Sequence, residues 1–178
     1  MRARRLLIGA ALAGLLAAAG CQLAGGSPAP VPTASESLVL RVTTVADGDT
    51  FTGKDPSGAK VKVRVLSIDA PELAHDGNLA ACGSKAAATR LRSLLSGHKV
   101  TVISDPRSDA VDRYGRRLAY VELDGRDVGL QLVTEGLVEA WYPSGEPEPA
   151  RFAAYAQAQH TAQQKRTGSW ASCTELGR

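Results

Sequence analysis

The pattern of apolar and polar positions predicts short strands in the first part of the chain and mainly helices in the last part. Apolar residues recur at every second position over residues 38–44, and again over residues 60–66, where Val61, Val63 and Val65 alternate with basic residues. A period of two is that of a strand with one buried face. Strand-like composition extends to residues 49–53, 99–104 and 116–123, with a short extended piece at 137–141.

Three segments repeat their apolar residues with the period of a helix instead. Ala87, Leu91, Leu94 and Leu95 share one face of a helix of about 12 residues that follows Ser84. Further helices are predicted over residues 128–135 and 150–165. Five strands with a helix after the third, followed by more helices, fit an α+β, mainly β, fold: a five-stranded OB-fold barrel capped by three helices. Other meanders fit this pattern almost as well.

The first 20 residues are predicted to be a signal peptide of the lipoprotein type. Arg2, Arg4 and Arg5 precede an apolar run, residues 6–19, that is too short to span a bilayer comfortably. The run ends in Ala-Ala-Gly-Cys at Cys21, which resembles the signal of a bacterial lipoprotein whose cysteine is lipidated. A plain cleavable signal or an uncleaved anchor stays open, because Ala stands three positions before the cysteine in place of the usual Leu. All of these lead to export, as a cell-envelope lipoprotein or a secreted protein.

The remaining residues divide into a tether and one folded domain. Residues 21–37 are rich in Gly, Ser, Pro, Ala and Thr, a composition typical of a flexible tether. A chain of 178 residues has room for one ordinary domain with a real core. We expect this domain at residues 38–173 and a tail at residues 174–178.

Export changes what the net charge implies. The chain has 21 Lys and Arg against 18 Asp and Glu, but three of the arginines lie in the predicted signal, which leaves 18 basic residues against 18 acidic ones. The mature chain is therefore close to neutral. Overall charge gives no indication of a nucleic-acid partner, and any site for a polyanion has to be local.

Export also favours a disulfide. If Cys21 carries lipid, Cys82 and Cys173 remain as an even pair in an oxidising compartment. The two lie far apart, with neither CxxC spacing nor a nearby histidine, and so make a poor metal site. We therefore predict a bond between Cys82 and Cys173.

Carboxylates and an arginine are predicted to meet where the third strand ends. The segment Ile-Asp-Ala-Pro-Glu, which contains Asp69 and Glu72, follows the strand that carries Arg64 on its polar side. If Lys54 and Ala59 close the preceding hairpin, Asp49 lies opposite Arg64, and partners across an antiparallel pair point to the same face. A slip by one residue would break this arrangement.

These residue types are the ones that hydrolysis of a phosphodiester requires: metal ligands, a base for water, and groups that bind phosphate. Asp49, Asp69 and a backbone carbonyl near Ala70 are hard oxygen ligands, which suit Ca²⁺. Glu72 lies beyond a rigid proline, close to the metal yet able to hold a water. Two arginines can each bind a phosphate bidentately, namely Arg64 and Arg116.

Taken singly, these residues have ordinary structural interpretations. Asp49 fits turn chemistry, Asp69 a turn at a strand end, and Arg64 a solvated position on a sheet. Arg90 and Arg92 likewise fit the solvated face of a helix. The conjunction of the first three with Glu72 and Arg116 is what favours a catalytic site.

Four spaced motifs resemble the staphylococcal nuclease-like, or thermonuclease, family. They are Asp-Gly-Asp-Thr at 47–50, Arg64 with Asp-Ala-Pro-Glu at 69–72, Asp-Arg-Tyr-Gly-Arg at 112–116 with Leu-Ala-Tyr at 118–120, and Glu-Gly-Leu at 135–137. They occur in the family's order over roughly residues 38–170. The resemblance implies a five-stranded barrel with three helices, and Ca²⁺-dependent cleavage of DNA and RNA on the 5′-oxygen side of the phosphate. Little sequence specificity is expected from contacts of this kind.

The resemblance also implies a role for each site residue. The metal ligands would be Asp49, Asp69 and the carbonyl of Ala70. The catalytic side chains would be Arg64 on the phosphate, Glu72 as general base or water-orienting group, and Arg116 on the charge of the transition state and leaving group. The substrate-binding residues would be Arg113, Tyr114 and Tyr142.

Two departures from the family and two other functions have to be weighed. Ala70 stands where Thr is frequent, and residues 73–81 lack the lysines of the best-known member. A catalytically silent barrel that binds nucleic acid or a protein partner should have lost one of the five catalytic-type residues, and none is lost. A structural lipoprotein of the cell envelope would bind no nucleotide. The expected protein is a monomer anchored to the membrane by lipid, with DNA and RNA as substrates.

Overall fold

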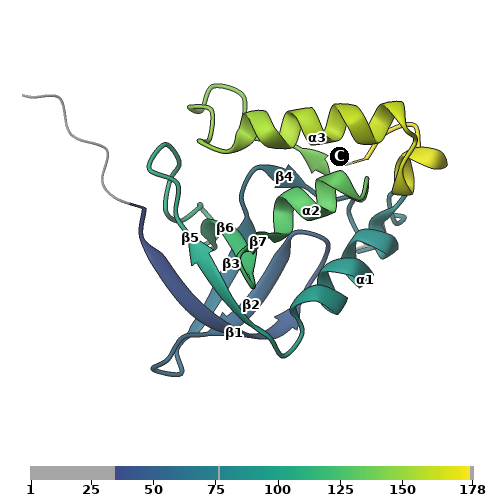
Figure 1. Ribbon diagram of the computed structural model, residues 1–178. Coiled ribbons are helices and arrows are strands. Elements are labelled where there is room, and N and C mark those ends of the chain that lie inside the picture. The colour runs from purple at the N-terminus through teal and green to yellow at the C-terminus, as the bar shows by residue number, and fades with distance from the viewer. Residues whose placement is uncertain (1–34, 76, 177–178) are drawn as a thin grey trace, which may run out of the picture. The chain divides into compact units, whose positions relative to one another are not determined.

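The structure is a computed structural model that describes residues 35–75 and 77–176 (Figure 1). The predicted signal peptide, Cys21 and nearly all of the predicted tether lie outside the described residues. Within the described ranges, no helix is long and apolar enough to cross a membrane.

Five strands close into a barrel: β1 (Ser37–Val45), β2 (Thr50–Lys54), β3 (Lys60–Val65), β5 (Lys99–Ile103) and β6 (Arg117–Leu123). They pair in the order β3-β2-β1-β5-β6, and a parallel pairing of β3 with β6 closes the barrel. Two short pairs are added: β7 (Arg126–Asp127) continues beside β6, and β4 (Ile68–Asp69) pairs with β8 (Glu139–Ala140). The predicted five-stranded OB-fold barrel is therefore confirmed.

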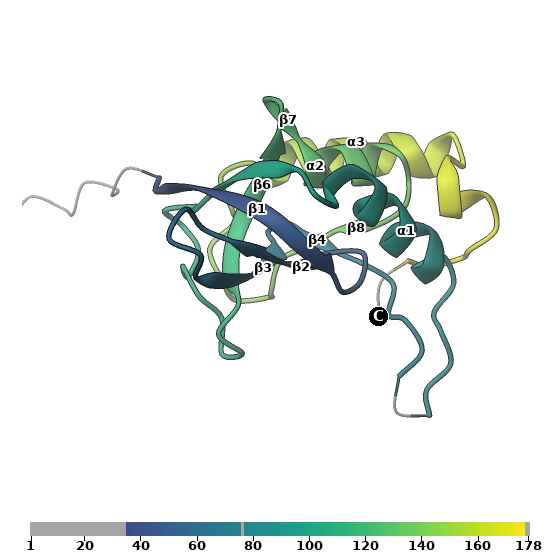
Figure 2. The same cartoon turned by 90° about the horizontal axis from the view of Figure 1, so that it is seen from below.

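Three helices pack on the barrel: α1 (Ser84–Leu95), α2 (Val128–Thr134) and α3 (Phe152–Gln164), followed by a 3₁₀ helix, η1 (Gly168–Ala171). Figures 1 and 2 show α2 and α3 side by side, with β1, β2 and β3 on the other side of the barrel. The alternation seen in the sequence decides which side chains fill the interior, because every second residue of each strand points inward. The core contains Leu40, Val42, Phe51, Val63, Val65, Val100, Val102, Ala119 and Val121, with Ala87, Leu91 and Leu95 from α1.

The hairpin between β2 and β3 has a register one residue away from the predicted one. Lys54 pairs with Lys60, and Thr50, not Asp49, pairs with Arg64. The difference arises in the turn, where Gly58 adopts φ 89° and the Asp55 N–H donates to the Ala59 carbonyl at 3.0 Å. Three residues then form the loop, which is the usual pairing when a glycine in the left-handed region completes the turn.

The C-terminal segment packs as a second, smaller cluster. Ala162, Trp170, Cys173 and Leu176 are buried together, so packing continues three residues beyond the expected end of the domain. The predicted disulfide between Cys82 and Cys173 is present, with a Cα–Cα distance of 5.8 Å. It joins the segment that leads into α1 to the segment that follows η1.

Candidate active site

The centre of the candidate site is the guanidinium of Arg64, which lies between two carboxylates. Its Nη2 is 2.8 Å from Oδ1 of Asp69 and 3.2 Å from Oδ2 of Asp49. Its Nη1 donates to the carbonyls of Val65 and Ile68, at 2.9 and 2.7 Å. All three charged side chains are largely buried, with exposed fractions of 9 to 14%. The structure thus brings together Asp49, Arg64 and Asp69, as the sequence predicted.

Asp49 reaches this cluster in spite of the shifted register, because it precedes β2 and lies in the turn that leads into it. The Asp47 carboxylate builds this turn by accepting from the N–H groups of Asp49 and Thr50, at 3.0 and 2.7 Å. The Asp49 side chain then turns inward. Its Oδ2 accepts from the Ala70 N–H at 2.8 Å, and its Oδ1 from the Thr50 hydroxyl at 2.9 Å.

Gly48, at the centre of the same turn, is required for packing. A Cβ at this position would lie 2.7 Å from the Cβ atoms of both Ala70 and Ala87. The turn therefore sits directly on the strand end that carries Asp69 and on the first turn of α1. This close approach holds the backbone of Asp49 against the backbone of Ala70.

Burial dominates the electrostatics of the cluster. It raises the pKa of Asp49 to about 7, against the opposing effect of Arg64 and with a further contribution from the charge of Asp47. A single guanidinium thus compensates the two carboxylates only in part. A buried pair of carboxylates with too little positive charge nearby favours an added cation.

A third carboxylate, that of Glu139, lies across the strand pair from Asp69. The pairing of β4 with β8 sets these two residues opposite each other. Burial raises the pKa of Glu139, and the charge of Asp69 adds to the shift, while a hydrogen bond from the Leu176 N–H opposes it. The sequence carries no signal for this neighbour, because it comes from a two-residue strand pair between distant segments.

The donor set fits a hard cation that accepts several kinds of oxygen. Within the described ranges, no group of three or more His, Cys, Asp and Glu side chains could hold a metal by itself. Asp49 and Asp69 would therefore be the carboxylate ligands, and carbonyl and water oxygens would complete the sphere. Ca²⁺ accepts such a mixed set, whereas Zn²⁺ sites are built mainly from His and Cys ligands, which this cluster lacks.

Glu72 lies just beyond the cluster and is exposed. Its carbonyl accepts from the Ala81 N–H at 2.9 Å, which closes the base of the loop that projects from the barrel in Figure 2. Its carboxylate has no hydrogen-bond or ion-pair partner among the residues that the structure describes. A side chain of this kind is available to a water or to a substrate.

Arg116 is held at the start of β6 by its own turn. Asp112 accepts from the N–H groups of Tyr114 and Arg116 through Oδ1, and from Nε of Arg116 at 2.7 Å through Oδ2. Burial alone would raise the pKa of Asp112, but these hydrogen bonds outweigh it and lower the pKa. Within β6, Leu118 pairs with Arg64 of β3. Arg116 is therefore two residues from the partner of Arg64, and its Nη groups are not bonded within the described structure.

The predicted substrate-binding residues differ in the contacts that they make. Tyr114 is 65% exposed, and the guanidinium groups of Arg113 and Arg116 lie 4.9 and 5.3 Å from the centre of its ring. Tyr142 instead packs edge-on against Phe152 of α3, with 4.6 Å between the ring centres.

A second sequence expectation, besides the register of β2 and β3, is wrong. Arg90 was expected on the solvated face of its helix, but it forms a bidentate ion pair with Glu135, in which Nε and Nη2 each lie 2.7 Å from a carboxylate oxygen. This pair joins α1 to the end of α2. Glu135 begins the Glu-Gly-Leu motif, which therefore has a structural use.

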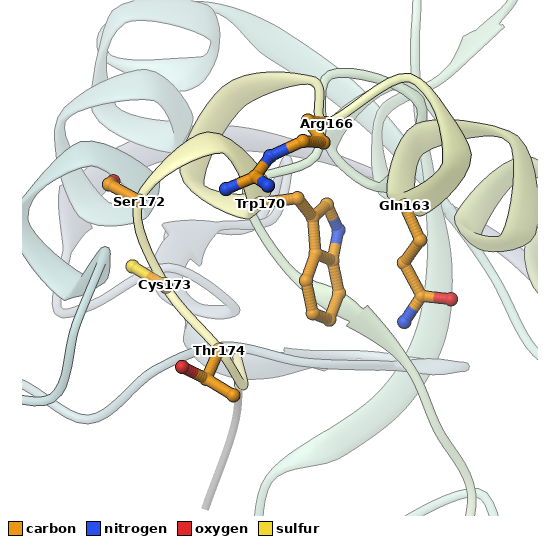
Figure 3. A pocket seen from close by; sticks show the side chains of 6 residues that line it. All are labelled: Gln163, Arg166, Trp170, Ser172, Cys173 and Thr174. Carbon is orange, nitrogen blue, oxygen red and sulfur yellow. The ribbon is translucent and has the colours of Figure 1, made fainter.

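An open pocket of about 460 Å³ occurs elsewhere, at the end of α3 and around η1 (Figure 3). Its lining residues are Gln163, Arg166, Trp170, Ser172, Cys173 and Thr174. None of the predicted catalytic or metal-binding residues belongs to it. Its one cation, Arg166, donates to the carbonyl of Ala171 at 3.0 Å. The pocket therefore adds no residue to the candidate active site.

Comparison with known proteins shows the family of this chain. The family described as "Staphylococcal nuclease homologue" matches residues 62–172, more than half of the chain. An "Uncharacterized endonuclease" of Haemophilus influenzae is 34% identical over 137 residues, which cover 76% of this chain and 68% of that protein. A "Thermonuclease" of Staphylococcus intermedius is 33% identical over 127 residues, 71% of this chain and 72% of that protein. "Endonuclease YhcR" of Bacillus subtilis is 37% identical over 123 residues, but these are 65% of this chain and 10% of that longer protein. The chain belongs to the family of staphylococcal nuclease homologues.

Proposed function

We propose that this protein is a Ca²⁺-dependent endonuclease that hydrolyses DNA and RNA on the 5′-oxygen side of the phosphate, with little sequence specificity. Membership of the family indicates a nuclease that acts on nucleic acid. The observation that carries the proposal is the buried cluster of Asp49, Arg64 and Asp69, with Glu72 and Arg116 at its border. It combines hard oxygen ligands with two guanidinium groups, as phosphodiester hydrolysis requires.

Asp49, Asp69 and the Ala70 carbonyl would hold the Ca²⁺ ion, which when bound polarises the phosphate. Arg64 has five N–H bonds and donates three of them, two to backbone carbonyls and one to Asp69. Of the other two N–H bonds, one belongs to Nη2, which also lies 3.2 Å from Oδ2 of Asp49, so the Nε–H is the one that stays available for a phosphate oxygen. Because Nη1 is fixed by the backbone, the guanidinium is oriented before the substrate arrives, which lowers the cost of binding.

Two residues at the border of the cluster would act on the attacking water and on the leaving group. Glu72 offers an exposed carboxylate that can take a proton from water, and it follows Asp69 by three residues. Arg116 uses Nε for Asp112 and keeps its Nη groups for the charge that develops on phosphate and leaving oxygen. Tyr114 presents an exposed ring on which any base can stack.

The test is digestion of plasmid DNA and of RNA in the presence of Ca²⁺ or of a chelator. The 3′ and 5′ ends of the cleavage products are then analysed. Cleavage on the 5′-oxygen side leaves 3′-phosphate and 5′-hydroxyl ends. The variants Glu72→Gln and Arg116→Ala should each lower the rate by at least about 10²-fold, because each removes a group that acts in the transition state. The variant Arg92→Ala, on the exposed side of α1, serves as the matched control. Unchanged rates in Glu72→Gln and Arg116→Ala would refute the assignment.

We also propose that the protein is exported and anchored through lipid on Cys21. The support is the basic and apolar segment before this cysteine. Metabolic labelling with a fatty acid should mark the wild-type chain and not the Cys21→Ser variant. Label on neither chain would point to a plain cleaved signal, and the proposal of lipidation would fail.

A further inference from the structure

Five basic side chains form a continuous track on the outer face of the barrel. Lys99 of β5 pairs with Arg41 of β1, Arg41 with Lys54 of β2, and Lys54 with Lys60 of β3. Lys62 continues the track along β3. The next residue on the same face of β3 is Arg64. The basic track, Lys99, Arg41, Lys54, Lys60 and Lys62, thus leads directly to the candidate active site.

The register places all five side chains on one face. Paired residues of neighbouring strands point to the same side, and residues two apart on one strand do so too. Val61, Val63 and Val65 take the inner side of β3, so the basic residues between them point outward. All five members of the track are exposed. Figures 1 and 2 show α2 and α3 on the other side of the barrel from β1, β2 and β3.

The charges of the track are not compensated. None of its five members forms an ion pair with any described residue, and Arg41 has one hydrogen bond, from Nη1 to the Gly97 carbonyl. Asp55 is the one carboxylate of the segment from Thr50 to Val65, and its Oδ1 accepts three hydrogen bonds within the turn. Arginines elsewhere are paired, among them Arg90, Arg117 and Arg151.

Folding alone does not account for this arrangement. Three successive cross-strand pairs carry like charges, and like charges directly opposite each other destabilise a sheet. Lysine often protects an edge strand from pairing, but β1, β2, β3 and β5 each have two neighbours in the closed barrel. A polyanion on this face would remove the repulsion. The near neutrality of the mature chain makes the local accumulation of charge more significant.

The dimensions suit a polynucleotide. From Arg64 to Lys60 the track runs about 13 Å along β3, and from Lys60 to Lys99 about 14 Å across three strand spacings. A strand of nucleic acid carries one negative charge every 3.4 Å or more along its axis, so such a length meets several phosphates.

We propose that the basic track binds the phosphate backbone of a polynucleotide beyond the bond that is cleaved. This inference rests on the proposed nuclease function, because it assumes that the bound nucleic acid is cleaved at Arg64 and continues from there along the track. An anionic membrane is the less suitable occupant, because a membrane on this face would cover Arg64 as well. Binding is electrostatic and reads no bases, so it adds affinity for long substrates without adding specificity.

The experiment measures binding of a fluorescent 30-nucleotide single-stranded DNA to the full chain with Glu72→Gln, at several salt concentrations. The track variant adds Lys54→Gln, Lys60→Gln and Lys62→Gln. The control adds Lys85→Gln, Arg92→Gln and Lys165→Gln, exposed residues on or next to helices, for the same change in net charge. The track variant should bind at least about tenfold more weakly at low salt, and the slope of log K against log salt should fall by about 2, or 0.7 for each lost phosphate contact. Equal effects of the two triple variants would overturn the proposal.

Two further measurements separate this proposal from its alternatives. With Glu72 intact, the ratio of kcat/KM for the 30-mer to that for a dinucleotide should fall in the track variant and not in the control. If neither substrate is cleaved by any form, the nuclease function fails, while the binding result still decides the track. Sedimentation with phosphatidylglycerol vesicles tests the membrane: loss of vesicle binding without loss of DNA binding would overturn the proposal. Thermal unfolding of each variant shows whether it is folded. The single variant Lys62→Gln, which changes the fold least, should show a smaller loss of DNA binding in the same direction.

Discussion

The four residues of the Asp-Gly-Asp-Thr motif each have a separate physical task. Asp47 builds the turn, Gly48 allows it to approach Ala70 and α1, Asp49 faces Arg64, and Thr50 donates to Asp49. Turn chemistry, the structural interpretation, therefore applies to Asp47, whereas Asp49 faces Arg64, the position that the functional interpretation requires. A turn that is fixed by its own hydrogen bonds positions the buried carboxylate without help from the strand register.

Gly48→Ala should test whether this close approach matters. The added methyl group would overlap the Cβ atoms of Ala70 and Ala87, so we expect the free energy of unfolding to fall by about 1 to 3 kcal/mol. Nuclease activity should fall too, because Ala70 moves relative to Asp49. Urea denaturation measures the first effect. Gly58→Ala is the control: nothing lies within 4 Å of its Cβ, and φ 89° accounts for its cost of about 1 to 2 kcal/mol, with activity retained. A Gly48→Ala protein as stable and active as wild type would contradict the interpretation.

The sequence predicted the identity of the site residues better than their surroundings. Asp49, Arg64 and Asp69 could be recognised from motifs, and they do meet. The predicted register would pair Asp49 with Arg64, whereas Asp49 meets Arg64 from the turn that precedes β2. Glu139 could not be found, because its position beside Asp69 depends on how two distant segments pair.

At the scale of elements, periodicity predicted the five barrel strands and the three helices to within about two residues. Buried and exposed faces follow from alternation, which is a local property. The register of β2 and β3 does not follow from alternation. It depends on whether the loop has three or four residues, and Gly58 at φ 89° decides that. The two-residue strands β4 and β8 are too short for any period to show.

The ion pair between α1 and α2 gives a pH dependence that can be checked. Hydrogen bonds from Arg90 lower the pKa of Glu135 below its ordinary value. A lowered pKa stabilises the fold above the unfolded pKa, near 4.5, and this stability is lost as pH falls through the folded pKa. About a third of each side chain is exposed, so solvent screens the pair and it contributes about 1 kcal/mol at most.

Glu135→Gln should therefore lower the free energy of unfolding at pH 7, and its difference from wild type should shrink as pH falls below 4.5. Chemical denaturation at pH 7 and at pH 3 measures this. Glu146→Gln, in the exposed loop before α3, is the control and should follow wild type throughout. A loss in Glu135→Gln that is as large at pH 3 as at pH 7 would show that packing, and not charge, is responsible.

At the scale of the whole molecule, the disulfide links the segment that leads into α1 to the C-terminal segment. Cys82 follows the loop that begins after Glu72 and directly precedes α1, whereas Cys173 belongs to the cluster of Ala162, Trp170 and Leu176. The pairing could be predicted by counting cysteines in an exported chain. What it holds together could not, because the burial of Leu176 shows only in the folded structure.

Removal of this disulfide should be the most destabilising of the changes considered. The bond spans 91 residues, and closing a loop of that length in the unfolded chain corresponds to about 4 to 5 kcal/mol. The variant Cys82→Ala/Cys173→Ala should lose roughly this amount in guanidinium denaturation. A reducing agent should bring the wild type to the stability of the variant and leave the variant unchanged, which separates loss of the bond from loss of side-chain packing. If reduction leaves the wild type as stable as before, the C-terminal cluster is held by its apolar contacts alone.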